Sequence, residues 1–99
     1  MGVYKVTGKN GKEIETEVIL HPGEVLGEEL GARAIPQKEF AELVDMRPPH
    51  LNELIKGKRH ISAILALKLE KQLGISAAFW LRLQIDYDLK IARKQLKVA

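Results

Sequence analysis

The sequence of 99 residues contains no cysteine, no secretory signal and no long apolar run. Without cysteine there is no disulfide framework, no thiolate nucleophile and no cysteine-bound zinc site. The longest apolar stretch, residues 61–67, is interrupted by Ser62 and is far too short to span a membrane. These absences favour a cytoplasmic protein.

Recognisable catalytic and metal-binding patterns are also missing. The histidines His21, His50 and His60 form no pair at the i, i+4 spacing of a helical metal site. No Ser-His-Asp set, glycine-rich phosphate loop or pair of carboxylates in an apolar setting can be identified. We therefore expect no metal, no cofactor, no small-molecule substrate and no enzymatic activity.

The composition predicts one folded domain. A chain of 99 residues has room for a single core, and 45% of its residues are hydrophobic. Such a small chain buries only a modest share of its surface, so association with a second copy would help to stabilise it.

Charge is distributed unevenly although the net charge is only +3. Residues 21–45 carry six acidic side chains against two basic ones, whereas residues 46–60 carry four basic side chains against Glu53 alone. The C-terminal residues 89–99 add four more basic side chains and no acid. Segregation of this kind suits a polyanionic partner on one face, although an ordinary solvated surface would look similar.

Residues 1–20 are predicted to form strand, turn and strand. Residues 3–7 and 14–20 are rich in β-branched side chains, and Gly-Lys-Asn-Gly at 8–11 is typical of a turn. Glu13, Glu15 and Glu17 alternate with apolar or β-branched residues and give the second strand an acidic face. Because two strands alone are marginally stable in water, this hairpin must pack on something else.

From Leu20 onward the pattern is helical. Five apolar pairs have the spacing of a hydrophobic staple, in which the residue before a helix cap packs on the fourth helical residue. Ser62 and Ser76 are good N-caps, while Gly57 and Gly74 stand where a helix would end in a left-handed residue. We expect a mostly α fold with helices at 22–33, 37–44, 48–56, 63–73 and 77–95, preceded by the N-terminal β-hairpin.

Residues 37–56 have the pattern of a helix-turn-helix. Two short helices flank the turn at 44–47, and Ala41 is a small residue that allows a close crossing. This arrangement projects the second helix outward, where its N-terminal residues can enter a DNA major groove. The pattern alone is a moderate signal, because small helical bundles often contain something similar.

Over residues 20–92 the chain resembles the HigA-type antitoxins, a branch of the Xre (phage-repressor-like) helix-turn-helix family. The resemblance is carried, in chain order, by His-Pro-Gly-Glu-Val-Leu at 21–26, Asn-Glu-Leu-Ile-Lys-Gly-Lys-Arg at 52–59, Ala-Leu-Lys-Leu at 66–69, Phe-Trp-Leu at 79–81, Leu-Gln at 83–84 and Tyr-Asp-Leu at 87–89. It implies a lambda-repressor-like domain over residues 21–99, following the 1–20 extension. It also implies a homodimer that binds double-stranded operator DNA and neutralises a co-transcribed, HigB-like mRNA-cleaving toxin.

Carried over by position, the resemblance also implies a DNA-binding surface. The residues of this surface lie at the start of the first helix of the motif, in the recognition helix, or in the basic loop that follows the recognition helix. They are Gln37, Lys38, Arg47, Pro48, Pro49, His50, Asn52, Glu53, Lys56, Lys58 and Arg59.

Three residues depart from the family pattern, and two prolines limit base reading. Asp45 replaces the usual turn glycine, Pro36 replaces a Ser or Thr cap, and Arg47 stands where a small polar cap is common. Pro48 and Pro49 offer no hydrogen bond, so direct readout would fall to Arg47 on guanine, Asn52 on adenine, Glu53 on cytosine, and His50. We expect phosphate contacts and DNA shape to contribute much of the affinity.

The last predicted helix carries two apolar stripes, more than packing on one domain requires. One stripe consists of Leu81, Ile85, Leu89, Ala92 and Leu96, and the other of Trp80, Leu83, Tyr87 and Ile91. One stripe suffices to pack the helix on its own domain, so the other is expected to be available for a partner subunit. The predicted dimer interface draws on both stripes and consists of Leu81, Ile85, Tyr87, Leu89 and Ile91. Phe79 and Trp80 are expected to belong to the core, since a large aromatic at a staple position is seldom a ligand contact.

Two other functions fit the sequence. The chain could be a stand-alone Xre-type regulator, including one paired with a metallopeptidase. It could instead be a protein-interaction module whose motif no longer reads DNA, which Pro48, Pro49 and Glu53 would favour. If the chain is an antitoxin, the acidic face of the 1–20 hairpin would suit a basic ribonuclease.

Overall fold

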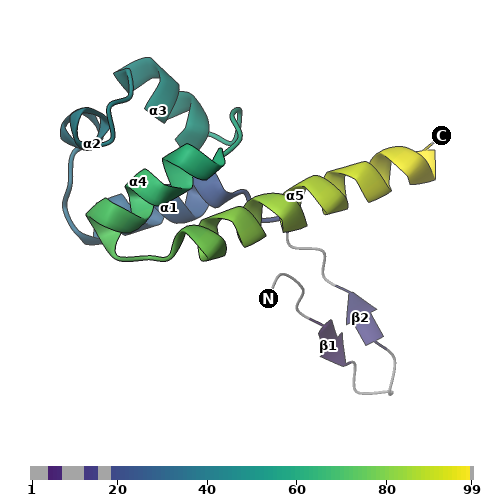
Figure 1. The fold of residues 1–99 in the computed structure, drawn as a ribbon. Coiled ribbons are helices and arrows are strands. Elements are labelled where there is room, and N and C mark those ends of the chain that lie inside the picture. Colours follow the sequence, from purple (N-terminus) through teal and green to yellow (C-terminus); the bar gives the residue numbers. More distant parts are fainter. Residues whose placement is uncertain (1–4, 8–12, 16–18, 99) are drawn as a thin grey trace.

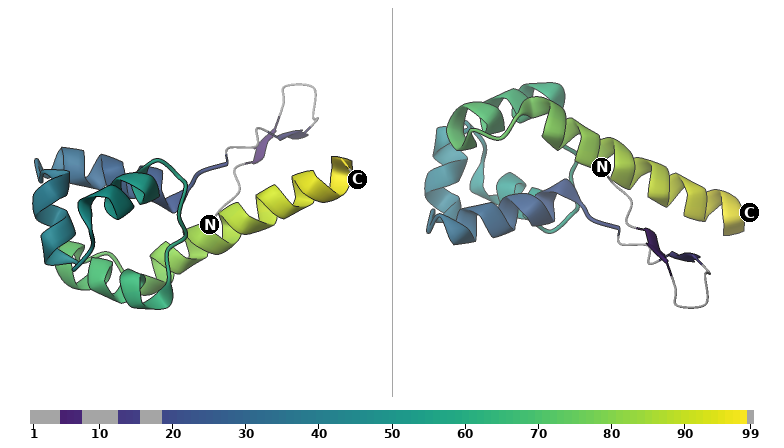
Figure 2. Two further views of the ribbon diagram at one scale, coloured as in Figure 1. Left: turned by 90° about the horizontal axis from the view of Figure 1, so that it is seen from above. Right: turned by 90° about the horizontal axis from the view of Figure 1, so that it is seen from below.

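The computed structural model describes residues 5–7, 13–15 and 19–98. In these ranges it contains two strands, β1 (Lys5–Thr7) and β2 (Glu13–Glu15), and five helices, α1 (Pro22–Ala32), α2 (Gln37–Leu43), α3 (Pro48–Ile55), α4 (Ala63–Leu73) and α5 (Ala77–Val98). Figure 1 shows α1 to α4 gathered in one bundle, with the C-terminal half of α5 extending beyond it. Both views in Figure 2 show the same extension.

The five predicted helices are confirmed. The first four begin where predicted and end within one residue of the predicted bound, whereas α5 continues three residues beyond residue 95. Lys97 lies in the last turn of α5, where a positive charge interacts favourably with the helix dipole. Within the described ranges, no helix has the length and apolar character needed to cross a membrane.

Local capping explains why the helices begin and end at these residues. Ser62 Oγ accepts a hydrogen bond from the Leu65 amide at 3.2 Å, and Ser76 Oγ accepts from the Phe79 amide at 3.1 Å. Gly74 ends α4 with a φ of 74°, in the left-handed region that glycine adopts without strain. The predicted caps at these positions are confirmed.

The departures from the family pattern have the expected structural effects. Pro36 and Arg47 occupy the N-cap positions of α2 and α3, and neither makes a side-chain cap hydrogen bond within the described part of the chain. Asp45 takes a φ of 55°, the left-handed conformation that the turn requires and that Asp tolerates better than most residues. The motif therefore keeps its backbone geometry without a turn glycine.

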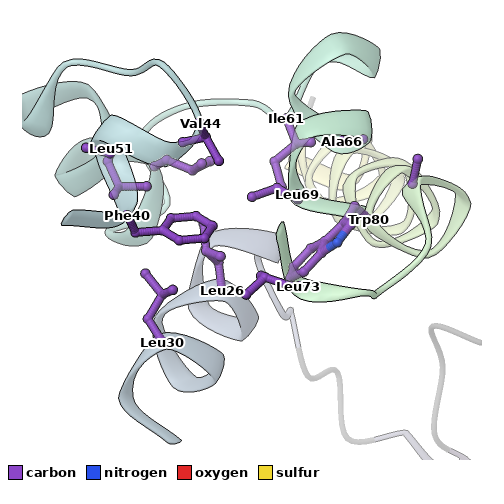
Figure 3. Close-up of a cluster of buried hydrophobic side chains, with 13 residues drawn as sticks. Leu26, Leu30, Phe40, Val44, Leu51, Ile61, Ala66, Leu69, Leu73 and Trp80 are labelled. Atoms are coloured by element: carbon purple, nitrogen blue, oxygen red, sulfur yellow. The ribbon is translucent and has the colours of Figure 1, made fainter. Parts of the chain in front are cut away.

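A single apolar core joins all five helices (Figure 3). Trp80 of α5 is completely buried in this core, together with side chains of α1, α2, α3 and α4. The expectation for Phe79 was wrong, because this side chain is 37% exposed and only meets the edge of Trp80. Trp80 occupies the staple position, whereas its neighbour faces outward because adjacent helical residues lie about 100° apart.

Helices α1 and α3 approach closely at Gly23. A Cβ atom at this position would overlap the backbone carbonyl of Leu54, so no larger residue fits without movement of the helices. The contact fixes the buried side of α3 and thereby directs its other side outward.

β1 and β2 form an antiparallel pair in which Lys5 faces Glu15, Val6 faces Ile14 and Thr7 faces Glu13. The predicted turn at 8–11, residues 3–4 of the first predicted strand and residues 16–18 of the second fall outside the described residues, whereas residues 19–20 are described and belong to no strand. The hairpin as an element over residues 1–20 therefore stays a prediction.

Candidate nucleic-acid interface

The two helices of the motif, α2 and α3, are locked together at the turn between them. The Met46 amide donates to the carbonyl oxygen of Ala41 at 2.8 Å, and Ala41 is fully buried. Leu51 and Leu54 are the fully buried residues of α3. The remaining side of α3 is free to meet a partner.

The predicted DNA-binding residues lie on α2, on α3 or next to them in the chain. Two of them, His50 and Asn52, are half-buried. The others are exposed: Gln37, Lys38, Arg47, Pro48, Pro49, Glu53, Lys56, Lys58 and Arg59. Figure 1 shows α2 and α3 at one end of the molecule, on the opposite side of the bundle from the free end of α5. Within the predicted set, hydrogen bonds join Asn52 to Gln37 and Arg59 to Glu53.

Asn52 connects the two helices of the motif. Its Nδ2 donates to Oε1 of Gln37 at 3.3 Å, across the start of α2 and the middle of α3. An amide held in this way presents its remaining polar groups in a restricted direction. Such restriction is useful for recognising an adenine edge.

Glu53 and Arg59 form an ion pair beside the recognition helix. Arg59 Nε donates to Oε1 of Glu53 at 2.7 Å, and both side chains are close to half exposed. This hydrogen bond lowers the pKa of Glu53 below its usual value, and the charges of His50 and Lys58 act in the same direction. The carboxylate is ionised at neutral pH and already has a cationic partner, which the sequence pattern did not predict.

The basic loop, residues 57–60, leaves α3 through a left-handed glycine. Gly57 has a φ of 82°, and the Lys58 amide donates to the Glu53 carbonyl oxygen at 2.8 Å. The loop therefore folds back on α3 and keeps the exposed Lys58 and Arg59 beside the recognition helix. Two adjacent cations on an exposed loop suit a DNA backbone.

His21 joins the interface to the rest of the domain. Its Nδ1 accepts from the Gly23 amide at 2.8 Å, and Glu24 Oε1 accepts from the His21 amide at 3.5 Å. Together these bonds form a capping box on α1. His21 is therefore the N-cap residue of α1.

The ring of His21 has a second contact that the sequence did not reveal. It packs edge-to-face on Tyr87 of α5, with ring centroids 4.6 Å apart. Burial lowers the pKa of His21, and the neighbouring His60 lowers it further. His21 is therefore neutral near pH 7, which suits its role as a hydrogen-bond acceptor.

The predicted dimer residues on α5 divide into two groups. Ile85 and Leu89 are 58% and 46% exposed, whereas Tyr87 and Ile91 are half-buried. Leu81 is also half-buried and packs on the core. The free apolar surface of α5 thus begins at Ile85 and continues through Leu89 to Leu96, which is 77% exposed.

Comparison with known proteins agrees with this geometry. The helix-turn-helix family HTH_3 matches residues 26–80, which include both helices of the motif and most of the core. The chain is 37% identical over 76 residues to virulence-associated protein I of Dichelobacter nodosus, covering 76% of this chain and 70% of the relative.

Solved structures of antitoxins show the same fold. An addiction module antidote protein of the HigA family from Coxiella burnetii is 38% identical, with a TM-score of 0.72 over 77% of this chain and 84% of that protein. The Pseudomonas aeruginosa antitoxin HigA, solved with the higBA promoter, is 33% identical, with a TM-score of 0.75 over 79% and 86%. The chain belongs to the Xre-type helix-turn-helix family of DNA-binding regulators and antitoxins, and its structural neighbours are HigA-family antitoxins and addiction-module antidotes.

Proposed function

We propose that this chain is the antitoxin of a toxin–antitoxin pair and represses its own operon. In this function a homodimer binds operator DNA and also neutralises a HigB-like mRNA-cleaving toxin. The observation that carries the proposal is the outward face of α3 with its basic loop, on a fold shared with an antitoxin solved on its promoter.

DNA binding would place the start of α3 in the major groove. Arg47 stands at the N-cap of α3 and is exposed, so its guanidinium can reach base edges ahead of the two prolines. Lys58 and Arg59 would contact the phosphate backbone on the same side. The Glu53–Arg59 ion pair makes Arg59 a directed donor, with part of its guanidinium left for a phosphate oxygen.

A homodimer would be formed through α5. Its exposed apolar residues Ile85, Leu89 and Leu96 follow one another along one side of a helix that extends beyond the bundle. A two-fold dimer would set two recognition helices about one turn of DNA apart, roughly 34 Å, over a palindromic site.

Toxin binding would involve the N-terminal extension, residues 1–20, as a unit separate from the domain at 21–99. β2 carries Glu13 and Glu15 on alternate positions of one strand, and acidic side chains suit a basic ribonuclease. None of the residues 1–20 belongs to the sets predicted for DNA binding or for the dimer interface.

The decisive experiment is co-expression of this chain with the product of the adjacent reading frame. Growth rescue, joint purification and binding of the complex to the DNA upstream of the operon are the expected results. Binding to that DNA without growth rescue or joint purification would identify a stand-alone regulator instead. Joint purification without any DNA binding would identify an interaction module.

A further inference from the structure

Gln84 of α5 is a polar side chain buried in the apolar core. It is only 5% exposed, and its Oε1 accepts a hydrogen bond from the Ile61 amide at 2.7 Å. Ile61 precedes the N-cap of α4, so its amide lies outside the hydrogen-bond ladder of that helix. Because burying an unpaired amide is costly, Gln84 satisfies a donor that the loop would otherwise leave unpaired.

The same side chain is also connected to His60 of the loop, through Asp88. Gln84 Nε2 donates to Oδ1 of Asp88 at 3.0 Å, and that oxygen lies 3.3 Å from Nε2 of His60. Gln84 and Asp88 are one turn apart on α5, and His60 and Ile61 are consecutive. One stripe of α5 therefore holds the end of the basic loop by two neighbouring residues.

The start of the loop is held by α3. The Lys58 amide and the Arg59 guanidinium both bond to Glu53 of α3, at 2.8 and 2.7 Å. Between these two anchors the loop and α5 border a pocket of about 280 Å³, lined among others by Lys58, Arg59, Tyr87 and Ile91. Asp88 and His60 also line this pocket, so the polar bridge formed by Gln84, Asp88 and His60 stands at its border.

The bridge stands next to the exposed apolar residues of α5. Ile85 directly follows Gln84, and Leu89 directly follows Asp88. The polar pair Gln84 and Asp88 and the apolar pair Ile85 and Leu89 therefore lie about 100° apart around the same helix.

We propose that Gln84, through its bond to the Ile61 amide and through Asp88 and His60, is a positioning residue for the basic loop. This inference rests on the proposed DNA binding. Gln84 itself contacts no DNA: it holds the backbone from which Lys58 and Arg59 extend.

The test is a double-mutant cycle. Gln84→Met removes both hydrogen bonds and keeps the side-chain length, and it is made in the wild-type chain and in the Lys58→Ala/Arg59→Ala variant. The probe is the double-stranded DNA immediately upstream of the gene, titrated at several salt concentrations. Gln72→Met is the matched control, since it makes the same change on α4, at a residue that does not line the pocket between the loop and α5.

In the wild-type background, Gln84→Met is expected to weaken DNA binding about fivefold, as loss of one net hydrogen bond would. The salt dependence should become shallower by about one phosphate contact. In the Lys58→Ala/Arg59→Ala background the same change should have little further effect, since residues that act through each other are not additive. Circular dichroism and mass in solution should match the wild-type protein.

An equal loss of affinity in both backgrounds would overturn the proposal, as would unchanged binding and salt dependence. If Gln84→Met does not fold, Asp88→Ala and His60→Ala, whose side chains are 45% and 73% exposed, test the same cycle. A wild-type chain that fails to bind the DNA would overturn the proposed function together with this inference. Normal wild-type binding with unaffected variants overturns the inference alone.

Discussion

At the scale of single residues, the surface around α3 contains cations placed for two different tasks. Lys58 and Arg59 extend from a loop beside the helix, whereas Arg47 stands at its N-terminus ahead of the exposed Pro48 and Pro49. Loop cations of this kind contact phosphates without regard to sequence, and a helix N-terminus reaches base edges. The two tasks predict different experimental signatures.

Replacing Lys58 and Arg59 by alanine should weaken binding to operator and to scrambled DNA alike. Each lost phosphate contact should reduce the slope of log K against log salt by about one, because fewer counterions are released. Fluorescence anisotropy at several salt concentrations measures this slope. Lys94→Ala/Lys97→Ala, on the far end of α5, removes the same charge and should leave the slope nearly unchanged. An unaltered slope for the loop variant would show that these side chains do not contact the backbone.

Arg47→Ala should reduce sequence preference. We expect a loss of about 1–3 kcal/mol on the favoured site, confined to one base step, since a bidentate arginine contact to guanine contributes about that much discrimination. Binding to single-base variants of the operator measures the effect. Equal losses on operator and scrambled DNA would remove Arg47 from the base-reading set.

His21 should make the stability of the fold depend on pH. Its pKa in the folded protein lies below the ordinary value of about 6.5, so the unfolded chain takes up the proton first as pH falls. The stability contributed by neutral His21 is complete above the ordinary pKa and declines as pH falls through the folded pKa. Thermal unfolding between pH 7.5 and pH 5 should show this decline.

The control for this titration is His21→Asn, because Asn can cap α1 and does not ionise in this range. Its unfolding temperature should start lower, owing to the lost contact with Tyr87, and should fall less steeply with acid. Parallel pH profiles for the two proteins would assign the acid sensitivity to groups other than His21.

At the scale of elements, α5 contributes two different surfaces. Trp80 and Gln84 face the bundle and are buried, whereas Ile85 and Leu89 are exposed. The first group holds the domain together, and the second is free for another subunit. A substitution restricted to the second group should therefore separate association from folding.

Leu89→Glu should halve the mass in solution while leaving the helical content unchanged. A charge at a 46% exposed position costs little in the monomer but is unfavourable in an apolar interface. Light scattering and circular dichroism measure the two quantities. Leu43→Glu, at a 55% exposed position on α2, introduces the same charge and should leave the mass intact. The dimer face lies elsewhere if Leu43→Glu dissociates the protein and Leu89→Glu does not.

At the scale of the whole molecule, three proposed activities use three separate regions. The surface of α3 would bind DNA, α5 would join two copies, and the N-terminal extension would bind the toxin. A division of this kind allows the toxin and the operator to bind at the same time.

Deleting residues 1–18 should abolish joint purification with the toxin and leave operator binding within about twofold, since distant sites act almost independently. The deletion ends before His21, so the capping box of α1 is kept. Pull-down of the co-expressed toxin and a DNA titration measure the two activities. If the shortened chain retains the toxin at full affinity, the toxin-binding surface must be on the helices.

The sequence by itself determined the helices, their caps and most of the core. These features depend on neighbours within one or two turns: Ser62 and Ser76 cap the helices that follow them, Gly74 ends α4, and Asp45 adopts the turn conformation. Residues this close along the chain interact in almost any fold that contains the helix. Patterns in the sequence therefore predicted them.

Only the tertiary structure decided which side chains meet across the bundle. The Gln84–Ile61 hydrogen bond and the His21–Tyr87 contact join residues 23 and 66 positions apart, and Gly23 abuts Leu54 across two helices. The same applies to α5, whose two apolar stripes look alike in sequence until packing buries Trp80 and leaves Leu89 exposed. Such contacts depend on helix crossing geometry, which no local pattern specifies.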